Sequence, residues 1–95
     1  MSVRLTAEAE RDIDEILRFG IVEFGEAQAE TYYRGLTERF ALLERWPEAA
    51  PVKAGARLPL RLFPYGSHVI LYMRDGDDIL ILRVLHGRSD WMELL

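Results

Sequence analysis

The polar side chains best suited to chemistry lie near the end of the sequence, where an apolar run gives way to Arg83, His86, Arg88 and Asp90. Histidine titrates near neutral pH, so His86 could transfer a proton while Arg88 binds an anion. A histidine at a strand end can equally be hydrogen-bonded to the backbone, and the spacing fixes no partner for it. We favour this second interpretation by roughly two to one and keep both.

Three more arginines could bind an anion. Arg57 and Arg61 fall on one face of a strand predicted over residues 57–63, where two guanidinium groups could clamp a phosphate or a carboxylate. A solvated sheet face or an internal ion pair would explain them equally well. Arg83 interrupts an apolar run, so it requires an acidic partner if it is buried. The first predicted helix offers Asp12, Asp14 and Glu15. For Arg83, a structural role is at least as well supported as a role in binding.

Other kinds of site find little support. The chain has no cysteine, and its two histidines and its acids show no metal-ligand spacing, so we expect no metal. Neither a glycine-rich phosphate loop nor a Ser-His-Asp arrangement is present, and we expect no cofactor. The sequence itself assigns no catalytic residue.

The polar end belongs to a predicted meander of three strands, over residues 57–63, 68–74 and 79–86. Residues 64–67 supply the first turn. Asp75 and Gly76 are expected at the centre of a type I′ turn between the second and third strands. Such a meander cannot bury its apolar face alone, so an earlier part of the chain must cover it.

Two helices precede the meander. Thr6 is a candidate N-cap for the first, and Gly25 fits the end of its apolar stripe. The second runs from about Glu26 to Arg45, and Pro47 ends it. Gly20 lies within the first stripe and indicates close approach of another element. Residues 3–5 could add a strand.

The predicted order is therefore β-α-α-β-β-β, an α+β fold in which a helical hairpin packs on a three- to four-stranded antiparallel sheet. The 95 residues are expected to form a single domain, 1–95.

Charge and hydropathy limit the partners. The formal net charge is −4. Residues 1–50 carry eleven acids and six bases, and residues 51–95 carry five acids and six bases. Strong direct binding to nucleic acid is therefore not expected. The sequence has no signal peptide and no long apolar run, which favours a cytoplasmic protein without a membrane partner.

Three large apolar residues lie outside the predicted stripes: Phe19, Val22 and Trp46. If they are contiguous and exposed, they form a partner-binding patch. If they are scattered, they carry no such meaning.

Several patterns together carry a family resemblance. They are Ala9-x-x-Asp12-Ile13-x-x-Ile16, Phe24-Gly25-x-x-x-Ala29-x-x-Tyr32, Leu36, Phe40, Leu43-x-x-x-Pro47, Tyr65-x-Ser67-x-Val69-x-x-Tyr72 and Ile81-x-Arg83-Val84-Leu85-His86-Gly87-Arg88-x-Asp90. With them the chain resembles, over nearly its whole length, the ParE branch of the ParE/RelE superfamily, the toxins of type II toxin–antitoxin modules.

The resemblance implies a RelE/ParE-like fold and a ParD-like antitoxin whose C-terminal segment follows a groove of the toxin. It implies DNA gyrase as the target and a non-enzymatic poison. The alternative, which the RelE branch implies, is a ribosome-dependent mRNA endoribonuclease that uses His86 and Arg88. A degenerate partner-binding domain without toxicity is a third possibility.

The sequence departs from the nuclease branch. Arg57 and Arg61 could supply that branch's bases on the first meander strand, and Arg88 its arginine after the last strand. The middle strand, however, offers His68 or Val69 where an arginine is typical. Trp91 stands where a tyrosine is common. We therefore favour gyrase inhibition. The expected target surface comprises Arg57, Arg61, Arg83, His86, Arg88 and Trp91, and the expected antitoxin-binding residues are Phe19, Val22 and Trp46.

Overall fold

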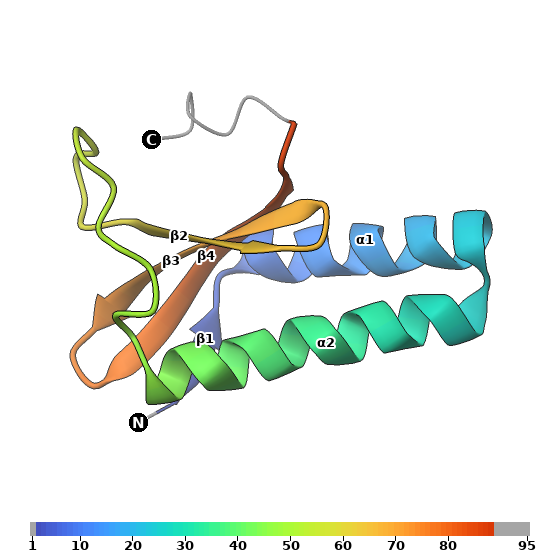
Figure 1. Cartoon of the computed structure of the whole chain (residues 1–95), viewed down its shortest axis with the longest axis horizontal. Helices are drawn as coiled ribbons and strands as arrows, with labels where there is room; N and C mark the ends of the chain where they lie inside the picture. Colours follow the sequence, from blue (N-terminus) through green and yellow to red (C-terminus); the bar gives the residue numbers. More distant parts are fainter. Residues whose placement is uncertain (1, 89–95) are drawn as a thin grey trace.

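The structure, a computed structural model, describes residues 2–88 and contains six elements in the predicted order. They are β1 (Val3–Leu5), α1 (Ala7–Phe24), α2 (Glu26–Arg45), β2 (Arg61–Tyr65), β3 (His68–Asp75) and β4 (Asp78–His86). The helices form one layer and the sheet forms the other, so the α+β class is confirmed (Figure 1). Within residues 2–88, neither helix is both long and apolar enough to cross a bilayer.

Both helices begin and end at signals that the sequence contains. The side-chain oxygen of Thr6 accepts the backbone N–H of Ala9 at 3.0 Å and caps α1. Gly25, with a φ of 90°, is the one residue between α1 and α2, which run antiparallel (Figure 1). A Cβ added at Gly20 would lie 3.3 Å from the Cβ of Ala29. The close approach predicted at Gly20 is therefore the contact between the two helices.

The first strand corrects one part of the predicted sheet. The strand order is β1-β4-β3-β2, and the three meander strands pair antiparallel as expected. β1, however, pairs parallel with β4, with Val3 opposite Ile79. The prediction of a wholly antiparallel sheet is wrong, and the sheet is mixed. No tight turn links β1 to its neighbour, so the sequence held no signal for its direction.

The second strand begins later than predicted. β2 covers Arg61–Tyr65, whereas the leucine alternation predicted a strand over residues 57–63. Residues 57–60 are not part of the sheet, and the backbone turns sharply there: the N–H of Leu60 donates to the carbonyl of Leu58 at 2.7 Å. Such a local hydrogen bond is incompatible with an extended strand, so the period-two pattern was misleading.

The turns of the meander also differ from the prediction. Asp75 pairs with Asp78, so Gly76 is the first of two central turn residues and not the second. Gly76 has a φ of 63°, and no non-glycine residue within 2–88 has a positive φ. This is the pattern of a type II′ turn, in place of the expected type I′. Gly66 plays the same part between β2 and β3, which leaves Pro64 inside the edge strand β2, where its missing N–H is tolerated.

A bulge interrupts the pairing of β3 with β4. The register shifts by one residue between Leu71 and Tyr72, so Leu82 is an extra residue on β4. Beyond the bulge, His68 lies opposite His86. The two histidines therefore share one face of the sheet at the end of β4.

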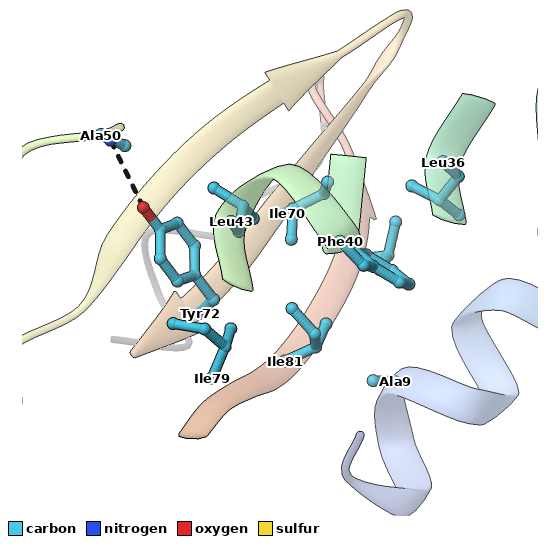
Figure 2. Close-up of a cluster of buried hydrophobic side chains, with 10 residues drawn as sticks. Ala9, Leu36, Phe40, Leu43, Ala50, Ile70, Tyr72, Ile79 and Ile81 are labelled. Atoms are coloured by element: carbon cyan, nitrogen blue, oxygen red, sulfur yellow. Dashed lines mark hydrogen bonds between the residues drawn. The ribbon is translucent and has the colours of Figure 1, made fainter. Parts of the chain in front are cut away.

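The core lies between the sheet and the helices, as Figure 2 shows. Its largest members are Leu36, Phe40 and Leu43 of α2 and Ile70, Tyr72, Ile79 and Ile81 of the sheet. The Tyr72 hydroxyl accepts the N–H of Ala50 at 3.3 Å (Figure 2). The same hydroxyl donates to the carbonyl of Pro47 at 2.9 Å. The prediction that the helical hairpin covers the meander is confirmed.

Candidate functional site

An apolar groove of about 580 Å³ lies between the helical hairpin and the ends of β3 and β4. The hairpin end of the two helices extends past the sheet (Figure 1). Phe19 and Phe24 line the groove and remain 62% and 60% exposed. Their rings pack edge to face with centroids 6.4 Å apart. An exposed apolar surface of this kind is typical of a site that binds a partner.

The three residues predicted for a partner-binding patch are not contiguous. Phe19 lines the groove, and Val22, which is 81% exposed, lies one helical turn further along α1. Trp46 is 64% exposed but follows the last residue of α2. It is about 30 Å along the helix from the hairpin turn. Only a partner that follows the length of α2 could contact all three.

The groove has one polar end, at the turn between β2 and β3. The hydroxyl of Tyr32, on α2, lies 2.7 Å from Nδ1 of His68 and donates to the carbonyl of Tyr65 at 3.1 Å. The Tyr65 hydroxyl returns a hydrogen bond to the carbonyl of Tyr32 at 3.0 Å. These contacts attach the β2–β3 turn to α2 and fix the ring of His68 at the end of the groove.

Two glycines make this attachment possible. A side chain at Gly35 would overlap the Tyr65 hydroxyl, and a Cβ at Gly66 would lie 2.5 Å from the Tyr32 hydroxyl. Gly66 also has a φ of 55°, which disfavours other residues. On the outer side, the guanidinium of Arg39 lies 5.1 Å from the centre of the Tyr65 ring.

The surroundings of His68 and Tyr32 shift the pKa values of both side chains. Burial lowers the pKa of His68 below its ordinary 6.5, and repulsion from His86 lowers it further. Burial also raises the pKa of Tyr32. Hydrogen bonds with Ser67 lower this pKa, but the effect of burial is larger. At neutral pH His68 is therefore predominantly uncharged, and Tyr32 keeps its proton.

His86 and Arg88 lie beside this end and are exposed. The backbone N–H of Arg88 donates to Nδ1 of His86 at 3.1 Å. The backbone hydrogen bond expected for a strand-end histidine is thus present. The ring of His86 lies 5.5 Å from that of His68, in an edge-to-face arrangement.

Arg83 has a structural role, because it attaches β4 to α1. Its Nε and one terminal nitrogen donate to the two carboxylate oxygens of Asp12, at 2.7 and 2.9 Å. Asp12 also accepts the N–H of Val84 at 3.0 Å, so α1 completes the edge of β4 where β1 has ended. The hydrogen bonds from Arg83 to Asp12 raise the pKa of the arginine further. The predicted partner on the first helix is confirmed, and it is Asp12.

Arg57 and Arg61 do not share a strand face. Arg61 opens β2, is partly buried and donates to the carbonyl of Ala50. Arg57 is exposed in the irregular segment that precedes the strand. The predicted two-arginine clamp is wrong because the strand does not extend back to residue 57. Trp91 and Asp90 lie outside the described residues.

Sequence reasoning missed the cluster of Tyr32, Tyr65 and His68. Its members come from α2, β2 and β3, and no motif spacing joins them. The one available signal was the cross-strand pairing of the two histidines, which the bulge obscured. Within residues 2–88, no group of three or more histidines and acids is arranged to hold a metal ion.

Known proteins resemble this chain in sequence and in fold. The sequence profile described as ParE toxin of type II toxin-antitoxin system, parDE, matches residues 3–91. Toxin ParE1 of Caulobacter vibrioides (strain ATCC 19089 / CIP 103742 / CB 15) is 32% identical over 83 residues, which cover 87% of this chain and 85% of that protein. Toxin ParE of Escherichia coli is 34% identical over 94 residues, which cover 96% of this chain and 89% of that protein.

A solved structure supports the same fold. A chain of the chromosomal ParDE TA system from P. aeruginosa superposes with a TM-score of 0.74 at 21% sequence identity. The match covers 90% of this chain and 95% of that one. The sequence profile and the two curated relatives identify the family: this chain belongs to the ParE toxins of type II toxin–antitoxin systems.

Proposed function

We propose that this chain arrests growth in the cytoplasm by inhibiting DNA gyrase, without catalysis of its own, and that a ParD-like antitoxin neutralises it by binding the groove. The observation that carries the proposal is the open apolar groove of a ParE-family domain, with Phe19 and Phe24 largely exposed. A protein segment with an apolar face would bury these rings, and aromatic side chains of this kind dominate binding energies.

The surface proposed for gyrase is the end of β4. His86 and Arg88 are exposed there, and the pairing of Arg83 with Asp12 holds that end of the strand in place. Trp91, which lies outside the described residues, is kept as a candidate from the sequence alone. Two further candidates are Arg57 and Arg61. Arg57 is exposed, and the side chain of Arg61 donates a hydrogen bond to the backbone carbonyl of Ala50.

Charge and geometry argue against the alternative of an mRNA endoribonuclease. α1 and α2 together carry ten acids and five bases, so the hairpin repels a phosphate backbone. β3 begins with His68, whose Nδ1 is engaged with Tyr32, where the nuclease branch would supply an arginine.

The test uses purified toxin in a gyrase supercoiling and DNA-cleavage assay, with and without the antitoxin encoded beside its gene. We expect toxin alone to block supercoiling and to accumulate cleaved DNA, and antitoxin to restore supercoiling. Uninhibited gyrase would refute the target. Codon-phased transcript cuts, mapped by primer extension, would support the nuclease instead.

The groove is tested separately with Phe19→Asp. This variant should remain toxic but escape neutralisation, with at least about 30-fold weaker antitoxin binding, because a charge would replace a central aromatic contact. Leu58→Asp is the matched control: Leu58 is 53% exposed in the loop before β2, away from the groove. Equal effects of the two substitutions would exclude the groove as the antitoxin site.

A further inference from the structure

The charged and titratable residues near the two ends of the groove differ. At the hairpin turn, residues 20–28 contain Glu23 and Glu26, both exposed, and no basic residue. At the other end lie His68, His86 and, next to His86, Arg88. Between the ends, the side chains that α1 contributes to the lining are all apolar. The apolar groove thus has two glutamates on the hairpin turn beyond one end and two histidines in its lining at the other end.

We propose that the groove binds an amphipathic protein segment in one direction, with a basic residue at the hairpin turn and a carboxylate at His68, and that this docking takes up a proton. The inference rests on the proposed function, since the segment is taken to belong to the antitoxin. It adds the charge pattern of the segment, its orientation, and a dependence of affinity on pH.

His68 is positioned for this role by the fold. Tyr32 holds Nδ1, and no hydrogen bond to Nε2 is found among the contacts of residues 2–88. No buried side-chain nitrogen or oxygen in that part of the chain lacks a partner. Nε2 therefore reaches solvent, and His68 lines the groove. A ligand in the groove can approach this nitrogen.

The neighbours of His68 make its protonation sensitive to an incoming anion. Tyr32 faces it from α2, Tyr65 from β2 and His86 from β4, and no carboxylate of residues 2–88 is among the groups that shift its pKa. Burial and His86 keep the pKa of His68 low in the free protein. A partner's carboxylate would raise that pKa. Between the free and bound values of this pKa, binding takes up a proton, and affinity rises as the pH falls.

The experiment measures antitoxin binding by calorimetry in phosphate and in Tris, whose ionisation enthalpies differ. We expect wild-type toxin to take up about half a proton or more near pH 6.5, and affinity to rise by up to about tenfold per pH unit between pH 8 and 6. His68→Asn, whose amide can keep the contact with Tyr32, should lose the uptake and bind about tenfold more weakly at pH 6 only. Arg74→Gln, on the distal half of β3, is the control and should behave like wild type.

A direct measurement covers the case in which His68→Asn does not fold. The chain has two histidines, so NMR can follow both ring signals in the wild-type protein, free and bound. The pKa of His68 must rise on binding. Unchanged titration, or proton uptake that persists in His68→Asn, would overturn the inference.

The proposed orientation has its own test. Glu26→Lys should weaken antitoxin binding at pH 6 and pH 8 alike, because the substitution reverses a charge at the hairpin turn and leaves His68 unchanged. Unchanged antitoxin affinity of Glu26→Lys would refute the proposed orientation. If Phe19→Asp weakens binding while His68 does not respond, the groove stands as the antitoxin site and only this inference fails. If Phe19→Asp has no effect, the proposed antitoxin site fails as well.

Discussion

The contact between Asp12 and Arg83 offers a sharp test of how α1 is fixed to the sheet. The Asp12 side chain is 11% exposed and accepts three hydrogen bonds, two from Arg83 and one from the N–H of Val84. Asp12→Ala would leave a guanidinium and a backbone N–H without their partner. Loss of one partner of a fully buried ion pair costs about 3–5 kcal/mol.

The Arg83 side chain is 32% exposed, so water can replace part of what it loses. We therefore expect Asp12→Ala to lower the free energy of unfolding by about 2–3 kcal/mol. Urea denaturation, followed by circular dichroism, measures this loss. With an m-value of about 1–1.5 kcal/mol/M for a domain of this size, the midpoint should fall by roughly 2 M.

Asp14→Ala provides the matched control. Asp14 lies on the same helix and pairs with Arg18, but the two side chains are 58% and 78% exposed. Its loss should cost less than about 0.5 kcal/mol. In a double-mutant cycle, Asp12→Ala combined with Arg83→Ala should cost clearly less than the sum of the single changes. Equal costs for Asp12→Ala and Asp14→Ala would refute the assigned role of the Asp12 carboxylate.

Three further predictions concern the groove end and the core. Gly35→Ala should lower the free energy of unfolding by about 1–3 kcal/mol in thermal melts, because the new methyl group would overlap the Tyr65 hydroxyl; a neutral or stabilising result would contradict this packing. Tyr72→Phe should cost about 1–2 kcal/mol in urea denaturation, since the N–H of Ala50 and a carbonyl lose their partner; an unchanged midpoint would show that water replaces the hydroxyl. The pKa of His68 is lower in the folded toxin than in the unfolded chain, so between these two pKa values the unfolded chain binds more protons than the folded one. The free energy of unfolding of the free toxin should therefore fall as the pH drops through this range. In thermal melts at pH 5 to 7, His68→Asn should reduce this dependence of stability on pH. The same dependence in the variant and the wild type would argue against the role of His68.

Local signals made much of the fold predictable. A capping threonine, the glycine between two amphipathic stripes and the proline after the second stripe fixed both helices to within a residue. Each of these signals acts through its own few neighbours in the chain. That Arg83 pairs with an acid of the first helix was also predictable, because a guanidinium withdrawn from water requires an acidic partner and that helix offered three; which of the three it is was not.

Other features depend on contacts that no local pattern encodes. The direction of β1 is set by the path of the whole hairpin, and the start of β2 by a sharp local turn at Leu58 that leucine alternation concealed. The groove end combines Tyr32 and His68 from distant parts of the chain. It could be found only once the distance between α2 and the β2–β3 turn was known.

The extra residue at Leu82 decides which way the last part of β4 faces. If the pairing of Asp75 with Asp78 continued without interruption, His68 would lie opposite Leu85, and His86 would point to the other side of the sheet. A relative that lacked one residue at this position could keep every motif residue of the family and still present a different binding surface. Comparisons among ParE toxins should therefore align this strand by its backbone geometry before they assign roles to its side chains.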